Sequence, residues 1–347
     1  MAGCLAAGRG RIACSWNNDL IYTVNMPTHP TDNLSLPQKL AVFLNRHLPR
    51  GKGSVPRKIG ALFSTDHSRS IVTREGALLA VEPTSLDVYA CMLNSGRTWN
   101  WHVLAACAAL LRPSQVFYDI GANVGFMSME MARIFHDCDA DRAIRVVSFE
   151  PLPWLAEAVA ASARLNHLRH FVVRDEIVSD RDGTTELFLG SHSIHASTQA
   201  RESHSLRLQR PMARIDSLVK AAAIPAPSVI KIDVEGGEFA AFRGAEETIH
   251  HHQPHIVFES DENTERFGYT RQDLLAFLTT LAPYRFFNIG PRGDELSTLS
   301  PDSDAKQEPA DILATVLDDT GVEAVAACLR HWAPGRRIDI RNTTKGI

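Results

Sequence analysis

Residues 116–131, VFYDIGANVGFMSMEM, contain the stretch that decides the fold of this chain. The apolar residues 116–118 predict a buried strand that ends at Asp119, and Gly121 and Gly125 predict a tight turn after it. The apolar positions of residues 126–134 recur with helical spacing. A strand, a tight turn and a helix make the first unit of a doubly wound α/β domain, so we expect a binding site at this turn.

The chemistry of this turn narrows the kind of ligand. Asn123 stands where a dinucleotide-binding G-x-G-x-x-G turn has its second glycine, so the spacing does not favour a pyrophosphate. Asp119, at the carboxyl end of the strand, suits a ligand that carries an ammonium group. The glycine spacing alone is equally typical of an ordinary strand-to-helix turn, and it is the acid that favours ligand binding.

Composition is typical of a soluble globular protein. Of the 347 residues, 44% are hydrophobic and 22% are charged, and the formal net charge of −4 gives no electrostatic reason to expect a nucleic-acid partner. Six cysteines without a C-x-x-C pair favour reduced thiols in a cytoplasmic protein over a disulfide framework or a zinc site. No apolar run reaches the roughly 18 residues of a membrane span, so we expect none.

The pattern divides the chain into an N-terminal extension, residues 1–60, and a main domain, residues 61–347, whose core covers about 95–320. We expect the extension to be partly disordered, with one short amphipathic helix at 36–48, and its first 25 residues to contribute little to folding. A hairpin is predicted at 69–82, with its turn at Glu75 and Gly76. The last residues, 333–347, are expected to fray.

Strands and helices alternate from residue 116 onward, which is the signature of an α/β fold. Residues 190–210 are polar and predict a long loop of the kind that covers active sites. The predicted helices are 99–111, 126–134, 154–168, 238–250 and 271–281. The predicted strands are 116–119, 145–149, 171–174, 228–233, 255–259, 286–289 and 312–317, with a turn and a further strand at 179–189 and a loop before the last strand.

Carboxylates follow the first, second and fourth of these strands, at Asp119, Glu150 and Asp233. In open α/β sheets ligands bind at the carboxyl ends of the strands. Glu150 ends the second strand, where a carboxylate can accept both hydroxyls of a ribose. The alternative is a charge at the start of a helix ahead of Pro151, but the preceding strand favours the ribose interpretation.

The segment IKIDVEGGE, residues 230–238, carries three acids, Asp233, Glu235 and Glu238. They are expected to have partners, because an unpaired buried charge is costly. Asp233 or Glu235 can cap the next helix, or the acids can serve a cation, a metal or a hydroxyl that must lose its proton. A divalent metal is not indicated, although Glu259 would be a plausible companion ligand. The histidines at 250–252 and His255 are interpreted as a solvated helix end.

The motifs together resemble the FkbM family of S-adenosylmethionine-dependent methyltransferases. In chain order they are DIGANVG at 119–125, FEP at 149–151, LNHL at 165–168, VSDRDG at 178–183, IKIDVEGGE at 230–238 with FRGAEETI at 242–249, and PHIVFE at 254–259. The resemblance covers roughly residues 95–320. It implies a class I methyltransferase fold, a Rossmann-like, doubly wound, mostly parallel seven-stranded sheet with helices on both faces and one antiparallel strand near its edge.

The resemblance also implies roles for individual residues. The methionine part of S-adenosyl-L-methionine would lie at the glycine turn, the ribose at Glu150 and the adenine beside residues 175–178, while Asp233 and Glu235 would face the methyl-transfer pocket as catalytic groups. Asp119 would suit the cationic end of the cofactor, and the backbone N–H groups of the turn would suit its carboxylate. The expected cofactor-binding residues are Asp119, Gly121, Ala122, Asn123, Gly125, Glu150, Pro151 and Glu176.

The implied reaction is O-methylation of a sugar or glycan, a glycolipid or a secondary metabolite. Two departures leave the acceptor open: the chain has Trp99, Asn100 and Trp101 where many relatives carry a Tyr-Glu pair, and residues 212–215 replace a threonine-rich strand. The alternatives are a nicotinamide-dependent oxidoreductase, which Asn123 disfavours, and a non-catalytic binding module of the same fold, which the retained acids disfavour. The sequence does not indicate the oligomeric state.

Overall fold

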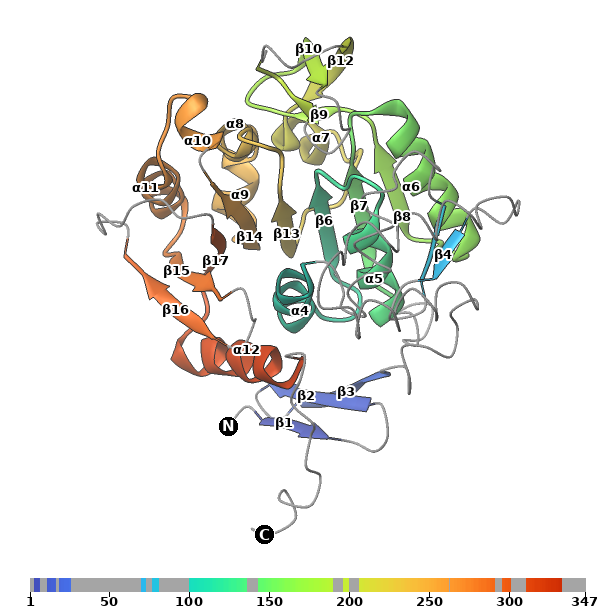
Figure 1. The fold of residues 1–347 in the computed structure, drawn as a ribbon. Coiled ribbons are helices and arrows are strands. Elements are labelled where there is room, and N and C mark those ends of the chain that lie inside the picture. The colour runs from blue at the N-terminus through green and yellow to red at the C-terminus, as the bar shows by residue number, and fades with distance from the viewer. Residues whose placement is uncertain are drawn as a thin grey trace, which may run out of the picture.

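The computed structural model describes residues 3–6, 11–16, 19–25, 70–72, 77–80, 100–135, 143–189, 196–199, 206–261, 263–290, 295–300 and 310–332. An eight-stranded sheet forms its centre (Figure 1). From one edge to the other its strands are β16 (Leu296–Leu299), β15 (Arg285–Ile289), β17 (Ala310–Thr315), β14 (His255–Ser260), β13 (Val229–Ile232), β6 (Val116–Ile120), β7 (Arg145–Phe149) and β8 (Phe171–Arg174).

The strand order reverses at β6, which fixes where a ligand can bind. Strands β6, β7 and β8 follow one another outward in parallel, whereas β13 and β14 add in parallel on the other side of β6. The crevice outside the carboxyl ends of β6 and β13 is therefore the topological switch point of the sheet. Strand β17 runs antiparallel between β14 and β15, and it is the antiparallel strand that was expected near the edge of the sheet.

The sheet has one strand more than the seven expected. Strand β16 pairs with β15 in antiparallel register and lies in the region that the sequence assigned to a loop. Its four residues carry two serine or threonine side chains and are at most half-buried, so no apolar alternation marked them as a strand. The addition extends one edge and leaves the fold class as expected.

Helices cover both faces of the sheet and bury two apolar clusters (Figure 1). One face is covered by α4 (Trp101–Leu110), α5 (Phe126–Ile134), α6 (Pro153–Leu165) and α12 (Asp319–Trp332). The other is covered by α7 (Ile215–Lys220), α8 (Glu238–Gly244), α9 (Glu246–His252) and α11 (Arg271–Leu281). Short α10 (Asn263–Arg266) follows β14. Because successive strand residues alternate between faces, every second residue of β6, β13 and β14 belongs to the same cluster.

Two predicted helices show what local sequence decides and what it leaves to distant segments. Helix α11 has the predicted bounds because Thr270 and Asp273 form a capping box at its start. The predicted helix 238–250 is instead two helices, α8 and α9, separated at Ala245. A Cβ on Gly244 would lie 1.9 Å from the Ser179 carbonyl oxygen, so the break is set by a close approach of a distant segment.

The predicted polar loop at 190–210 is only partly a loop. Strand β12 (Leu206–Ala213) pairs along the whole of β10 (Gly183–Leu189), and short β11 (Ala196–Ser197) and β9 (Ile177–Val178) complete a four-stranded sheet. Leu208 pairs with Leu187 across this sheet, and the alternation that produces the pair is visible in the sequence. Residues 190–195 and 200–205 lie outside the described residues.

The N-terminal region contains strands that the sequence did not indicate. Strands β1 (Gly3–Ala6), β2 (Arg11–Trp16) and β3 (Asp19–Asn25) form an antiparallel sheet whose first strand lies beside α12 (Figure 1). The predicted hairpin is confirmed as β4 (Ser70–Val72) and β5 (Leu78–Ala80). Asn166 and Ser162 of the α6 region hold β5 through its backbone, with Asn166 Oδ1 accepting from Leu78 N at 2.8 Å.

Two further sequence predictions, the helix at 36–48 and the frayed end at 333–347, fall outside the described residues. Within the described part of the chain, no helix combines the length and the apolar character needed to cross a membrane.

Candidate functional site

Side chains from neighbouring strands form one row at the carboxyl edge of the sheet. The ladders between β7, β6, β13 and β14 bring the residues that follow these strands level with one another, and Glu259 of β14 pairs directly with Asp311 at the start of β17. We call this set the carboxyl row. From β7 to β17 it consists of Glu150, Gly121, Asp233, Glu259 and Asp311.

Gly121 is the one member of the carboxyl row without a side chain. Its φ of 81° lies in the left-handed region, and a Cβ there would lie 1.9 Å from the Asp233 carbonyl oxygen. Only glycine fits, and the missing Cβ allows the Asp233 backbone to approach the turn closely. Gly125 has a different role, because its missing Cβ faces Val159 of α6 at 3.0 Å and allows two helices to approach.

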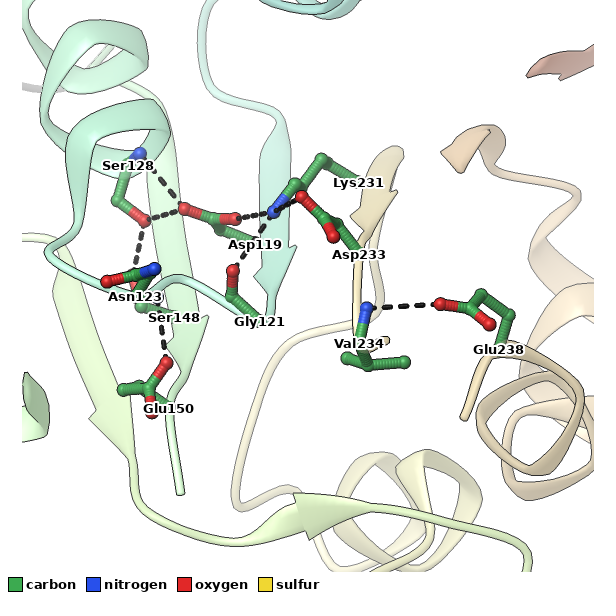
Figure 2. A network of polar contacts seen from close by, with 10 residues as sticks. All are labelled: Asp119, Gly121, Asn123, Ser128, Ser148, Glu150, Lys231, Asp233, Val234 and Glu238. Atoms are coloured by element: carbon green, nitrogen blue, oxygen red, sulfur yellow. Dashed lines mark hydrogen bonds and ion pairs between the residues drawn. The ribbon is translucent and has the colours of Figure 1, made fainter. Parts of the chain in front are cut away.

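Glu150 is held by backbone N–H groups. Its Oε2 accepts from Asn123 N at 2.8 Å (Figure 2). Its Oε1 accepts from Leu152 N at 2.9 Å. The residue is 5% exposed, and burial raises the pKa of its carboxyl to about 7, while the two N–H donors oppose that rise. Each oxygen retains a lone pair that can accept a ligand hydroxyl, so the position suits a ribose diol.

Asp119 does not reach the cavity, contrary to the expectation that it contacts a ligand. Its carboxylate is fully buried, and Oδ2 accepts from Ser128 N at 3.1 Å and from Ser128 Oγ at 2.6 Å (Figure 2). Ser128 Oγ also lies 2.6 Å from Ser148 Oγ. The other carboxylate oxygen of Asp119, Oδ1, lies 3.3 Å from Lys231 Nζ. Asp119 therefore anchors the first turn of α5 and positions the lysine behind the site.

Most N–H groups of the glycine turn are also engaged within the protein. Gly121 N and Ala122 N both donate to the Phe149 carbonyl, and Asn123 N donates to Glu150. They are therefore not the donors for a ligand carboxylate that the sequence suggested. The bonds instead fix the turn against the end of β7, which holds Gly121 and Glu150 in the carboxyl row.

Lys231 is the cation of the site, and the sequence did not single it out. Its Nζ donates to the Gly121 carbonyl at 3.0 Å and lies 3.3 Å from Asp119 and 3.5 Å from Asp233 (Figure 2). Burial lowers the pKa of this ammonium group, but the two carboxylates outweigh burial and the net pKa is raised. The sequence did contain a signal for this role, because Lys231 is a charged residue inside the otherwise apolar strand β13. A buried lysine needs a charged partner.

The loop after β13 is held by Glu238 rather than by Asp233 or Glu235. Glu238 Oε1 accepts from Val234 N at 3.1 Å (Figure 2). The same oxygen accepts from Gly236 N at 3.3 Å, and Oε2 accepts from Tyr269 Oη at 2.8 Å. Glu238 is 3% exposed and burial raises its pKa. Of the three acids in this motif, Glu238 thus has a structural role, which leaves Asp233 and Glu235 at the cavity.

The backbone of Glu235 has an uncommon conformation that orients its side chain. Its φ of 57° is in the left-handed region, which is uncommon for residues other than glycine. Asn263 Nδ2 donates to Glu235 Oε2 at 3.2 Å. Such a conformation persists only where the surroundings enforce it, and here it turns the side chain toward the cavity.

At the opposite end, residues after β8 border the site. Glu176 accepts from Arg174 Nε at 3.1 Å, and the pair is joined by a second guanidinium contact. Ile177 and Val178 line the same wall with Pro151. This wall is mostly apolar beside Glu150, which suits a flat ring system adjoining a ribose.

The carboxyl row faces a cavity of about 360 Å³. The apolar walls of the cavity come from α5, α6 and the four-stranded sheet of β9–β12. Its polar wall comes from the ends of the central strands. Eight predicted site residues line it, and the other two, Asp119 and Gly125, do not. The eight are Gly121, Ala122, Asn123, Glu150, Pro151, Glu176, Asp233 and Glu235.

The cavity also exposes groups that the sequence had not assigned to a cofactor site, namely Glu259, Asn100 and Lys231. Glu259 lies beside Asp233 and hydrogen-bonds with it. Burial raises the pKa of Glu259 to about 9, and the neighbouring acids Asp233 and Asp311 add to the rise. Glu259 therefore holds a proton at neutral pH.

The described residues contain no group of three or more His, Cys, Asp or Glu side chains that could hold a metal ion. His250 Nδ1 lies 2.9 Å from the Leu281 carbonyl, and His255 Nδ1 lies 2.9 Å from Thr315 Oγ1. Burial lowers the pKa of His255 to about 4. His255 is therefore a neutral, structural side chain on the sheet.

A comparison with known protein families finds a match to the region that carries most of the carboxyl row. Residues 119–286 match the family model described as the methyltransferase FkbM domain, which confirms the resemblance of the motifs. The matched segment includes Glu150, Asp233 and Glu259. No curated protein matches the chain.

Solved methyltransferase structures resemble the chain distantly. A methyltransferase FkbM from Methylobacillus flagellatus is 16% identical, has a TM-score of 0.41, and aligns over 67% of this chain and 55% of its own. A precorrin-6Y C5,15-methyltransferase from Geobacter metallireducens is 12% identical, with a TM-score of 0.35 over 61% and 85%. A putative methyltransferase from Streptococcus mutans in complex with SAH is 6% identical, with a TM-score of 0.34 over 61% and 93%. The present chain thus spans 55% of the length of the Methylobacillus structure it matches.

Proposed function

We propose that this chain, whose residues 119–286 belong to the methyltransferase FkbM domain family, transfers a methyl group from S-adenosyl-L-methionine to a hydroxyl group. The acceptor is a small molecule or glycan: a sugar, a glycolipid or a secondary metabolite. The observation that carries the proposal is the cavity of about 360 Å³ with Glu150 at one end of its polar wall and Asp233 and Glu235 toward the other.

The residues present fit the cofactor. Glu150 offers two carboxylate oxygens, each fixed by one backbone N–H, to the hydroxyls of a ribose. The missing Cβ of Gly121 lets the backbone of Asp233 pack directly against the turn, which places Asp233 at the same cavity. Ile177, Val178 and Pro151 supply an apolar wall for the adenine. Asp233 and Glu235 supply negative charge for the cationic end, in place of the buried Asp119.

When bound, the cofactor supplies a methyl group on a sulfonium, which an acceptor oxygen attacks in line. Most of the acceleration can come from positioning that oxygen. Asp233 accepts the hydroxyl proton, and Glu235 orients the hydroxyl from the adjoining loop. Lys231, 3.5 Å from Asp233, holds that side chain in place between reactions.

Calorimetry tests the cofactor assignment directly. S-adenosylhomocysteine is expected to bind the wild-type chain at one site, and Glu150→Ala should weaken it by about 1.5–3 kcal/mol, the value of a hydrogen bond to a charged group. Glu157→Ala is the matched control, because Glu157 is an exposed glutamate of α6 paired with Arg164. Unchanged affinity in Glu150→Ala would refute the ribose assignment, and preferential binding of a nicotinamide dinucleotide would favour an oxidoreductase.

Turnover tests the acceptor class. The protein is incubated with labelled cofactor and fractionated host glycans and metabolites, and methylated products are identified. With an acceptor in hand, Asp233→Asn should lower kcat by about 10²-fold with little change in cofactor affinity. Near-normal turnover of this variant would transfer the proton-accepting role to Glu235.

The proposal includes a cytoplasmic location and no nucleic-acid partner. The six cysteines lack paired spacing, and Cys107 and Cys328 are buried. The net charge of −4 supports a neutral or small polar partner over a polyanion. Cell fractionation and binding to labelled duplexes check these two points.

A further inference from the structure

Glu259 occupies a position in the carboxyl row where acids meet from different strands. Asp311 pairs directly with it across the antiparallel ladder, and Asp233 follows the parallel strand on its other side and hydrogen-bonds with it. Asp261, from the loop after β14, adds a third negative charge nearby. Directly opposed like charges are destabilising, so this arrangement cannot hold all its carboxyls ionised at little cost.

The basic side chains of this region, Lys231 and His102, contact other acids than Glu259. Lys231 lies between Asp119 and Asp233, at 3.3 and 3.5 Å. His102 of α4 has its Nε2 2.6 Å from Asp311 Oδ2. The groups that face Glu259 itself are the acids Asp233, Asp311 and Asp261. A proton therefore takes the place of a cation at Glu259.

We propose that Glu259 makes cofactor binding proton-linked and selective for charge: it holds a proton in the free protein, releases it to solvent when a cationic ligand enters beside Asp233, and so favours S-adenosyl-L-methionine over its neutral demethylated product. This inference rests on the proposed function. It follows from the contact of Glu259 with both the cavity and the neighbouring acids.

The size of the effect follows from Coulomb's law. Burial and the surrounding acids raise the pKa of Glu259 to about 9, so at pH 7 the side chain is protonated. A unit positive charge ~6 Å away, at an effective dielectric constant of about 20, increases the proton dissociation constant about 100-fold. The sulfonium supplies such a charge, and the thioether of the demethylated product does not.

The same group closes the proton balance of the reaction. The acceptor oxygen forms a C–O bond, the S–CH₃ bond breaks with its electron pair left on sulfur, and the hydroxyl proton leaves the oxygen. The ionised Asp233–Glu259 pair takes up that proton, since the cationic charge has disappeared from the site. Re-protonation of Glu259 then removes the attraction that selected the cationic ligand, which favours exchange of the product for a new cofactor.

The test measures proton release by isothermal titration calorimetry at pH 7 in phosphate and in Tris, two buffers with different ionisation enthalpies. S-adenosyl-L-methionine and S-adenosylhomocysteine are titrated into the full wild-type chain and into Glu259→Gln. Because a 100-fold larger dissociation constant leaves about half of the bound Glu259 side chains ionised at pH 7, the wild type should release about half a proton more per S-adenosyl-L-methionine than the variant does. Its affinity for this ligand should tighten about fivefold between pH 7 and 8, while that of the variant stays nearly constant. Contributions from Glu150 and from the ligand's amino group are common to both proteins and cancel in the difference.

Glu265→Gln is the matched control, because Glu265 is an exposed glutamate of α10 near the site and should behave as the wild type. Thermal melts of all three proteins verify folding. Equal proton release by the wild type and Glu259→Gln, or equal release with both ligands, would overturn the inference while leaving the methyltransferase proposal intact. Failure of both ligands to bind the wild type would overturn the proposed function and this inference with it.

Discussion

Glu150 and Glu259 are glutamates at strand ends in the same row, yet their surroundings differ in kind. Glu150 is 5% exposed and receives a backbone N–H on each oxygen. Glu259 is only half-buried, and it faces other carboxyls. The less buried of the two has the higher pKa, about 9 against about 7. Burial raises both values, and the partner groups decide the order.

The difference divides the cavity into two functional ends. An ionised carboxylate with fixed lone pairs recognises neutral hydroxyl donors and fixes their geometry. A carboxyl that holds a proton only because acids surround it responds to the arrival of positive charge. Lys231 lies between the two ends and forms ion pairs with the inner carboxylates, Asp119 and Asp233.

Removing Lys231 should have the largest effect. Lys231→Met leaves the fully buried Asp119 and its neighbour Asp233 without their cation, and breaking such a buried pair costs about 3–5 kcal/mol. Chemical denaturation monitored by circular dichroism measures the loss. Lys220→Met, at an exposed position of α7, should change stability by less than about 1 kcal/mol. Equal, small effects in both variants would show that the central ion pairs do not hold the site.

The glycine that separates the two ends should be the next most sensitive position. Gly121→Ala combines a positive φ with a Cβ 1.9 Å from the Asp233 carbonyl oxygen, and we expect a loss of about 2–4 kcal/mol together with loss of ligand binding. Gly268→Ala has nearly the same φ, 79°, and no atom within 4 Å of the new Cβ, so it isolates backbone strain at about 1 kcal/mol. Similar losses in the two variants would assign the whole effect to strain.

Adenosine binding isolates the Glu150 end. Because the pKa of Glu150 in the free protein is about 7 and hydroxyl donors favour its ionised form, adenosine affinity should fall by up to tenfold for each pH unit below 7. Above pH 7 it should be nearly constant. Fluorescence or calorimetric titration between pH 5.5 and 8.5 measures the profile. A profile that instead follows a group titrating near pH 9 would show that adenosine binding depends on Glu259, and would contradict the division of the cavity into two ends.

Stability against pH should show the smallest effect. A glutamate whose folded pKa is raised to about 9 from an unfolded value near 4.5 contributes stability that is complete below pH 4.5 and is lost as the pH rises through 9. Between pH 6 and 8.5, the wild type should therefore lose at least about 2 °C more in Tm than Glu259→Gln does. Parallel melting curves for the two proteins would contradict the raised pKa.

The sequence was informative where the chemistry is local. The turn at residues 119–125, the strand-end acids Glu150 and Asp233, and the capped helix α11 were all predicted from short patterns, and the structure has these elements where expected. The family match confirmed the resemblance that the ordered motifs indicated. These features depend on residue type and spacing, which a sequence displays.

Partners across long separations were not predictable in the same way. Asp119 was expected at the ligand, but Ser128 and Lys231 occupy both of its oxygens. The proton held at Glu259 depends on its pairing with Asp311, 52 positions along the chain, which only strand register reveals. Strands β1–β3 lack a strong apolar period and form by pairing with one another.

A crystal structure of the full chain with S-adenosylhomocysteine tests the central claim most directly. The account predicts that the ligand lies in the cavity above the carboxyl row, with both ribose hydroxyls about 2.7 Å from the Glu150 carboxylate and its sulfur on the side of Asp233. A ligand bound elsewhere, or one whose ribose contacts groups other than Glu150, would contradict it.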